Sequence, residues 1–267
     1  MRLIPISLML LLLITGCAST GNPGDEHDPT RDWSAEKLYR EATKKMNRGE
    51  YDTAVSYFET LESRFPFGDY TRQAQLDIAY AYLKQDEFDN AIASADQFIK
   101  LHPQHEAVAY AYYIKGLANF SRGQSMMERL FPRDIAKVDQ NWLQSAYANF
   151  DTLLRRYPDS QYSEDARQRM IYLREQMARH ELLTARYYYK RGAMVAAINR
   201  CDYLLEHFGQ TPSAPKALEI MVKAYRVMGQ DDLADKTLAI LALNDPDNKL
   251  VKNSGQTNTG KQTTANN

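Results

Sequence analysis

One arrangement of apolar and polar positions recurs through most of the chain. In each copy a turn residue precedes an alanine, an amphipathic stretch follows, and a stopping residue comes about twelve positions after the alanine. The five anchor alanines are Ala54, Ala91, Ala146, Ala197 and Ala234. A further apolar stretch with a spacing of three to four lies before each turn. Since that spacing marks one face of a helix, each copy predicts two antiparallel helices.

Glycine and proline are placed to end these helices. Glycines stand where the first helix of a pair should stop, since left-handed backbone is tolerated there. They are Gly49, Gly123, Gly192 and Gly229. The second helix is stopped by Pro66, Pro103, Pro158 and Pro246, with Gly209 in the remaining copy. Small residues inside the first helices (Ala42, Ala79, Gly116 and Ala185) should let the helices approach closely.

The pattern resembles tetratricopeptide repeats over roughly residues 35–246. Because a single pair cannot bury its apolar face alone, the resemblance implies an all-α fold, a right-handed α-solenoid of about five helix pairs. The anchor alanines are 37, 55, 51 and 37 residues apart. The spacing of 51 residues is longer than 37 because it contains 163–191, a segment that lacks Gly and Pro and predicts one long helix capped by Ser163. The spacing of 55 residues is longer because of an insert (123–144) in the third repeat, which is either a lid on its own repeat or a partner-binding loop.

The two ends of the chain differ from the repeats. Residues 1–16 predict a signal peptide, because the apolar stretch is short and small residues precede Cys17. Ile14–Cys17 resembles the bacterial lipobox, which implies that Cys17 is acylated and holds the protein on a membrane. Ala18, in place of an aspartate, implies the outer membrane; an ordinary secretory leader is the alternative.

Composition sets the remaining boundaries and excludes some functions. Residues 17–32 predict a lipidated N-terminus and flexible tether, 33–122 and 145–248 the N-terminal and C-terminal repeats, and 249–267 a disordered tail. The net charge of −1 gives no basic excess, so we expect no nucleic-acid partner. Cys201, in an apolar run, predicts a small buried hydrophobe rather than a nucleophile.

No motif in the chain predicts catalysis, a metal or a cofactor. Ser34 and Lys37 match the S-x-x-K pair of some acyl enzymes, but serine is the expected cap where the first helix starts. His102 and His105 are separated by Pro103, which breaks the helix between them, so a polar turn is favoured over a metal site. We therefore expect a protein that is not an enzyme.

Aromatic and aliphatic residues occupy the first-helix positions that line the concave wall of such repeats. With two residues of the loop at 65–70, they predict a groove for an extended peptide with aromatic side chains. These residues are Tyr39, Phe67, Tyr70, Leu76, Tyr80, Tyr113, Leu117 and Phe120. The alternative is that some of them only pack between repeats.

Cations occupy the same wall in the last two repeats. Arg179, Arg186, Tyr189, Lys190, Lys216, Lys223 and Arg226 lie there, and Arg191 and Arg200 should reach outward. This pattern favours an acidic protein surface as partner, since complementary charge fixes register. A merely solvated face is the alternative.

Several segments are similar to one family of lipoproteins. They are RFPFGDY (64–70), FDTLLRRYPDSQYSEDARQRM (150–170), YYYKRGAMVAAINR (187–200) and ALEIMVKAYRVMGQDDLA (217–234). With the lipobox, they resemble the BamD (ComL) family of the β-barrel assembly machinery over the whole ordered chain. The resemblance implies a periplasm-facing outer-membrane adaptor that helps insert β-barrel proteins.

The resemblance also implies the partners. The N-terminal repeats would recognise the C-terminal signal of unfolded outer-membrane proteins, and the C-terminal repeats would hold the POTRA region of the barrel subunit, BamA. The implied POTRA contacts are Arg186, Tyr189, Lys190, Arg191, Arg200, Lys223 and Arg226, with Arg200 foremost. Other lipoproteins of the machinery are further partners. The alternative is an envelope scaffold linked to peptidoglycan or to DNA uptake and competence.

Overall fold

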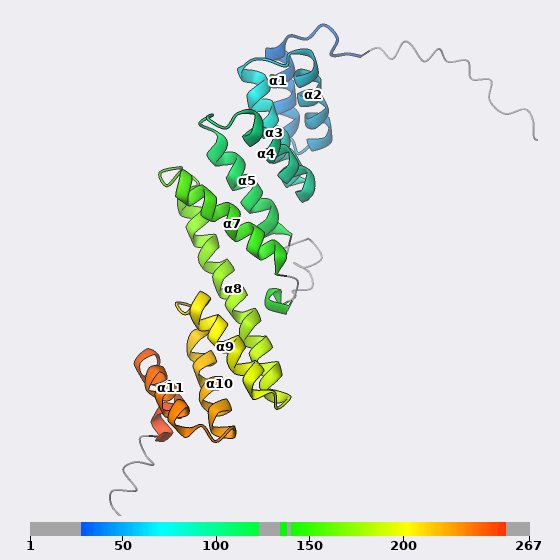
Figure 1. The fold of residues 1–267 in the computed structure, drawn as a ribbon. Coiled ribbons are helices and arrows are strands. Elements are labelled where there is room, and N and C mark those ends of the chain that lie inside the picture. Colours follow the sequence, from blue (N-terminus) through cyan, green and yellow to red (C-terminus); the bar gives the residue numbers. More distant parts are fainter. Residues whose placement is uncertain (1–27, 123–133, 138–139, 255–267) are drawn as a thin grey trace, which may run out of the picture. The chain divides into compact units, whose positions relative to one another are not determined.

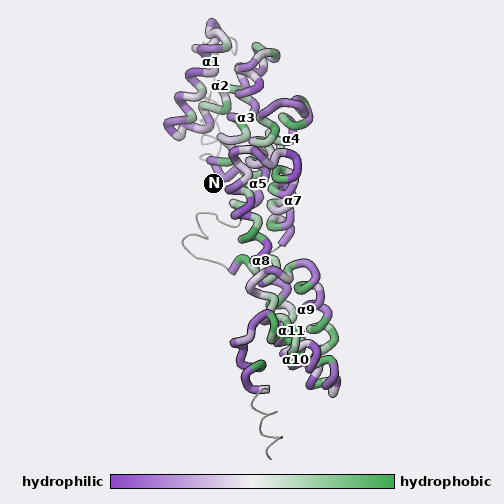
Figure 2. Tube along the Cα trace, turned by 90° about the vertical axis from the view of Figure 1, so that its left-hand side faces the viewer, coloured by the Kyte–Doolittle hydropathy of each residue, from purple (hydrophilic) through white to green (hydrophobic). Residues whose placement is uncertain are grey.

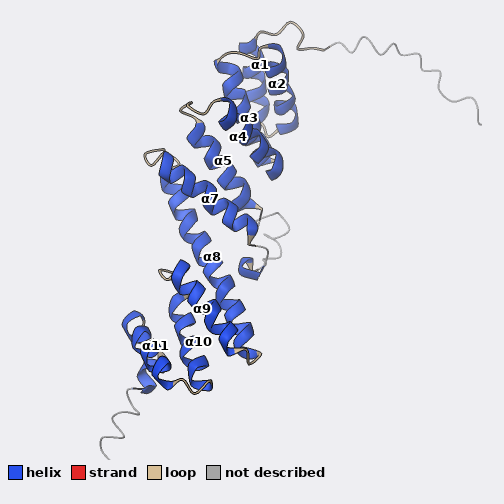
Figure 3. Cartoon of the chain, viewed as in Figure 1, coloured by secondary structure: helices blue, strands red, loops and turns tan. Residues whose placement is uncertain are grey.

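The computed structural model describes residues 28–122, 134–137 and 140–254, in which all regular elements are helices (Figures 1 and 3). The predicted signal peptide, Cys17, most of the tether and most of the insert lie outside the described residues. The segment before Ala35 is a unit separate from the helical body that follows.

The helices of the body form consecutive antiparallel pairs. They are α1 (Ala35–Asn47) with α2 (Tyr51–Arg64), α3 (Asp69–Lys84) with α4 (Phe88–Leu101), α5 (Val108–Ser121) with α7 (Asn141–Arg156), α8 (Ser163–Lys190) with α9 (Met194–Phe208), and α10 (Ala214–Val227) with α11 (Asp231–Asn244). Each helix packs on the next along the chain. The prediction of an all-α fold of tetratricopeptide-like pairs is confirmed for the parts of the chain that the structure describes.

The turns inside four of the five pairs, which are the turns that the structure describes, use left-handed backbone. Gly49, Gly192 and Gly229 have φ of 77°, 78° and 72°, and Asp86 takes the same place in the second pair with φ of 61°. In these four turns the next residue's N–H donates to a carbonyl five positions earlier, for example Glu50 to Lys45 at 3.0 Å. This is a helix C-cap that glycine adopts without strain. Gly123 lies outside the described residues.

Small residues bring the helices of each pair together. The five anchor alanines are fully buried. Gly116 in α5 lies against the ring of Phe150 in α7, so closely that a methyl group on Gly116 would overlap that ring. Apolar positions recur along the helices between polar ones (Figure 2), and they join into cores shared by neighbouring pairs.

The long helix predicted from residue 163 is present as α8, and it serves two cores. Ala166, Leu173 and Met177 pack with α5 and α7, whereas Ala178 and Leu182 pack with α9 and α10. The prediction that Ser163 caps this helix is wrong. Tyr162 is the cap residue, and the buried Ser163 hydroxyl donates to the carbonyl of Tyr157 at 2.8 Å, where it secures the preceding turn instead.

Two segments outside the pairs also pack on the body. The described end of the insert includes the 3₁₀ turn η1 (Ile135–Lys137), which lies against α8, the first helix of the following pair. There His180 Nδ1 donates to the carbonyl of Ala136 at 2.8 Å, and Arg179 pairs with Asp134 at 3.1 Å.

The predicted start of the disordered tail at residue 249 is wrong for residues 249–254. These residues are helical, because Leu250 and Val251 pack on the core of the last two pairs. Residues from 255 onward lie outside the described part. Within the described residues, every helix is too short or too polar to cross a membrane.

Candidate functional site

The side chain of Tyr39 in α1 is hydrogen-bonded to Asp77, a buried acid in α3. Its hydroxyl donates to Asp77 Oδ2 at 2.9 Å, and Gln73 Nε2 donates to Asp77 Oδ1 at 3.2 Å. Burial raises the pKa of Asp77 above its ordinary value, although the two hydrogen bonds oppose the shift. Burial, followed by the charge of Asp77, also raises the pKa of Tyr39. Two neighbouring first helices are therefore joined by a buried polar contact.

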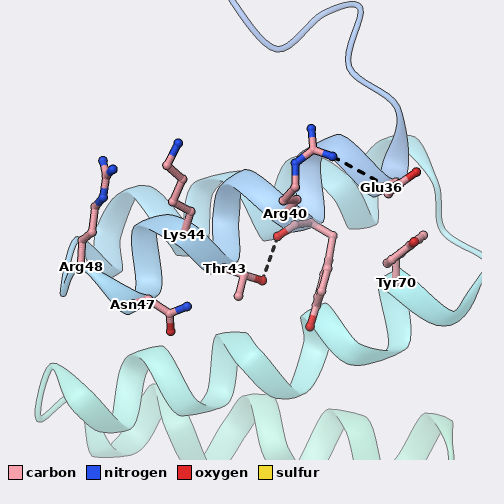
Figure 4. Close-up of a pocket in the computed structure, with 8 residues that line it drawn as sticks. Glu36, Arg40, Thr43, Lys44, Asn47, Arg48 and Tyr70 are labelled. Carbon is pink, nitrogen blue, oxygen red and sulfur yellow. Dashed lines mark hydrogen bonds and ion pairs between the residues drawn. The ribbon is translucent and has the colours of Figure 1, made fainter.

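A pocket of about 580 Å³ lies over α1 beside Tyr39, and we call it the α1 pocket. The Tyr39 ring lies 5.8 Å from Phe58 and 5.4 Å from Tyr70, centroid to centroid. In Figure 4, Thr43 faces α3, and three cations project from α1 as the rim of the pocket. They are Arg40, Lys44 and Arg48. Arg40 forms two long ion pairs, with Glu36 and Glu41 at 3.9 Å each, and Lys44 pairs with Glu41 at 3.5 Å. Since these exposed pairs are weak, the rim can still meet an anion.

A second aromatic and ionic contact joins α5 to the start of α8. The Tyr113 ring stacks on Tyr162 at 4.8 Å, and its hydroxyl donates to Asp165 Oδ2 at 2.8 Å. Arg169 donates to the same carboxylate at 2.5 Å and lies over the Phe120 ring at 4.8 Å. Burial, then the bond to Asp165, raises the pKa of Tyr113 to about 12. For Asp165, burial is outweighed by the bonds from Arg169 and Tyr113, which lower its pKa.

The other predicted groove residues differ in exposure. Phe67 is 92% exposed in the turn before α3, and Tyr80 and Leu117 are half-buried against neighbouring cores. Leu76 is 1% exposed and belongs to the core that contains Phe98 and Ile114, yet it also lines a pocket between α3 and the start of α5, so its place on the wall stays a prediction. It lies where α3 crosses α5, which the spacing of one helix does not reveal. The groove itself stays a prediction.

The predicted partner surface lies on α8, α9 and α10. Arg186 and Lys190 are exposed, and Arg191 lies over the Tyr187 ring at 5.3 Å. Tyr189 packs partly against the core. Lys223 pairs with Glu219 at 3.5 Å and Arg226 with Asp235 at 3.8 Å within the last pair.

Arg200 is not as free as the sequence suggests. Its guanidinium pairs with Glu181 of α8 at 3.2 Å, and the Glu181 side chain is 13% exposed. Docking of α9 on α8 brings this acid beneath Arg200, a pairing that the sequence does not reveal. Since the Arg200 side chain is itself half-exposed, it keeps a face toward solvent.

Exposed apolar residues near these cations escaped the sequence reasoning. Val195 in α9 is 58% exposed and Val227 at the end of α10 is 62% exposed, with Met228 beside it in the chain. Each of these valines lies outside the apolar stripe that its helix buries. An apolar residue outside that stripe is the sequence signal that could have identified both. Such residues, rimmed by cations, are typical of protein interfaces.

The remaining chemical candidates are structural. Cys201 is buried, as predicted, and burial raises the pKa of its thiol to about 12, so it stays protonated. The rings of His102 and His105 both pack near Phe98, at 5.1 and 5.5 Å, in the turn between α4 and α5.

Replacing Asp77 with asparagine should change how stability depends on pH. Because the folded pKa of Asp77 is raised, its contribution to stability is full below the ordinary carboxyl pKa and is lost as the pH rises through the raised value. Asp77→Asn cannot ionise, so it should lack this loss, as urea unfolding over a pH series will show. Asp165→Asn is the control of opposite sign, because the folded pKa of Asp165 is lowered. The wild-type contribution of Asp165 to stability is lost as the pH falls, and the Asp165→Asn variant should lack this contribution at every pH. Parallel pH profiles for wild type and Asp77→Asn would contradict the assignment.

The stacked helix pairs, with tyrosines bonded across the first helices and cations on the last two pairs, define a tetratricopeptide-like repeat protein. Residues 31–240 match the family model described as YfiO: Outer membrane lipoprotein. The chain therefore belongs to this family of outer membrane lipoproteins, which places it at the outer membrane.

Relatives of known name agree with this assignment. "Outer membrane protein assembly factor BamD" of Neisseria meningitidis serogroup A is 39% identical, over 96% of this chain and 96% of the relative. The Vibrio cholerae protein of the same name is 37% identical, over 89% and 96%. The resemblance to the BamD family is thereby confirmed. Among solved structures, the MamA protein has a TM-score of 0.38 and 18% identity over 79% of this chain and 92% of that chain, too loose a likeness to add to the assignment.

Proposed function

We propose that this protein is a lipid-anchored adaptor, without catalytic activity of its own, that faces the periplasm and promotes insertion of β-barrel proteins into the outer membrane. The name of its relatives, outer membrane protein assembly factor, supports this role. Acylated Cys17 is the proposed anchor. A repeat protein suits an adaptor because its stacked helix pairs can present two separate binding surfaces. Here these are the aromatic surface of the first pairs and the cationic surface of the last two pairs.

The N-terminal pairs are the proposed receptor for the C-terminal segment of substrate barrels. The α1 pocket carries this proposal, since tyrosine rings stand beside a rim of cations. The rings suit the aromatic side chains of a terminal strand, and the cations suit a chain-terminal carboxylate. The exposed Phe67 extends the aromatic surface at the turn before α3.

The C-terminal pairs are the proposed docking surface for the POTRA region of BamA. Exposed apolar side chains there are accompanied by cations, an arrangement that suits an acidic partner. The proposed contacts are Arg186, Tyr189, Lys190, Arg191, Arg200, Lys223 and Arg226, to which the structure adds Val195 and Val227.

Peptide binding tests the first half of this proposal. A fluorescent peptide of about ten residues that ends in phenylalanine should bind more tightly with a free carboxylate than as the amide. Arg40→Ala with Lys44→Ala should remove this preference, by about tenfold in Kd, because the rim loses two cations. Anisotropy titration measures the effect, and Lys100→Ala, an exposed cation on α4, is the matched control.

Two results would contradict the proposal. Equal binding of acid and amide would remove the carboxylate from the site. Tight binding of duplex DNA, with a steep dependence on salt, would instead favour the scaffold linked to DNA uptake.

A further inference from the structure

A second pocket, of about 490 Å³, lies between α3, the start of α5 and the turn before α8. We call it the acceptor pocket. Its polar lining comes from Gln73, Glu106, Tyr110, Ser160, Gln161 and Tyr162. Among the residues that the structure describes, no lysine, arginine or histidine lines it. The three elements are far apart in sequence, so this lining exists only when the second, third and fourth pairs are stacked.

The pocket offers hydrogen-bond acceptors, and each of its two glutamines already uses one of its two amide N–H groups. Gln73 Nε2 donates to Asp77, and Gln161 Nε2 donates to the Tyr162 hydroxyl at 2.9 Å. Each glutamine therefore keeps its carbonyl oxygen as an acceptor. Glu106 is exposed and forms no ion pair with any residue that the structure describes, so it adds a whole negative charge.

The pocket also has an aromatic wall. The rings of Tyr110 and Tyr162 stack at 5.0 Å. Burial, followed by the charges of neighbours that include Asp77, raises the pKa of Tyr110, which agrees with surroundings that are negative rather than positive. A cation beside stacked tyrosine rings gains both from the rings and from the carboxylate. A guanidinium presents five N–H donors in one plane and matches such acceptors best.

We infer that the acceptor pocket binds an arginine or lysine side chain of the same extended peptide that the α1 pocket holds. The inference rests on the proposed function, since it needs a peptide in the groove. Asp77 links the linings of the two pockets, because it accepts from Tyr39 of the α1 pocket and from Gln73 of the acceptor pocket. One pocket is rimmed by cations and the other carries an acid. A peptide with a terminal carboxylate and an internal cation therefore binds in one direction only.

A series of peptides that carry one arginine, each at a different position, tests the acceptor pocket. The probe is the phenylalanine-ended peptide with one arginine placed in turn at each internal position, compared with citrulline, its neutral counterpart, at the same position. At the position that reaches the pocket, wild-type protein should bind the arginine peptide about fivefold more tightly than the citrulline peptide. Glu106→Gln should abolish that advantage. Glu59→Gln, which neutralises an exposed acid on α2 outside both pockets, should preserve it.

Each other outcome counts against the pocket in a distinct way. If all peptides bind equally, the groove stands and the acceptor pocket is refuted. An arginine advantage that survives Glu106→Gln also refutes it. If a glutamate at the same position binds best, the N-terminus of α5 takes an anion instead, and the inference is wrong. If no peptide binds, the proposed receptor role is refuted together with the pocket.

Discussion

Arg200→Glu is expected to abolish co-purification of this protein with the POTRA region of BamA, with a loss of affinity of at least about tenfold. The substitution reverses a charge at the centre of the proposed docking surface. It also places a second carboxylate beside Glu181, which is mostly buried. Because Arg200 is half-exposed, the loss of the pair should lower the free energy of unfolding by only about 1 kcal/mol.

The charge swap separates these two effects. In Arg200→Glu with Glu181→Arg, the ion pair is rebuilt with its charges exchanged, so the melting temperature should return to nearly the wild-type value. Binding to the POTRA region should stay lost, because position 200 still presents the wrong charge. If the swap restores binding together with stability, Arg200 acts by holding α9 on α8 and does not contact the partner.

Gly116→Ala is expected to destabilise the described body strongly. The added Cβ would overlap the ring of Phe150, which is fully buried. Overpacking of this kind costs about 2–3 kcal/mol, which should lower the melting temperature by roughly 5–10 °C. Thermal unfolding followed by circular dichroism measures it.

The matched control is the same substitution at Gly49. A Cβ at Gly49 meets open space. Gly49→Ala should therefore lower the free energy of unfolding only by the strain of a Cβ at positive φ, about 1 kcal/mol. In the double variant Gly116→Ala with Phe150→Leu, part of the lost stability should return, since the smaller side chain leaves room for the methyl group. A Gly116→Ala protein as stable as Gly49→Ala would show that α5 and α7 are less tightly packed than the structure indicates.

The helices and their ends were predictable because their signals are local. Gly49, Gly192 and Gly229 mark turns that need a positive φ, and a proline follows the end of most second helices. Asp86 shows the limit of that rule, since an aspartate fills the turn where the other pairs have glycine. The long helix α8 was predictable from the lack of Gly and Pro between residues 163 and 191.

The contacts of the site were less predictable because they join distant positions. Tyr39 meets Asp77 across 38 residues, Tyr113 meets Asp165 across 52, and the spacing of one helix face holds no information on either pairing. One signal was present: Asp77 is an acid inside the apolar run QLDIAYAYL, and a buried acid needs a donor. The burial of Leu76 was unpredictable for the same reason, since only the docking of α5 decides that it is covered.

The boundary between two of the cores falls inside α8, between Met177 and Ala178, and not in a loop. Tension applied between a substrate at one end and an anchored partner at the other would therefore act along an unbroken row of backbone hydrogen bonds. Helix α8 would extend only if the hydrogen bonds of a helical turn broke, whereas a flexible linker would extend without breaking any. The proposed N-terminal and C-terminal surfaces are thus joined by one continuous helix.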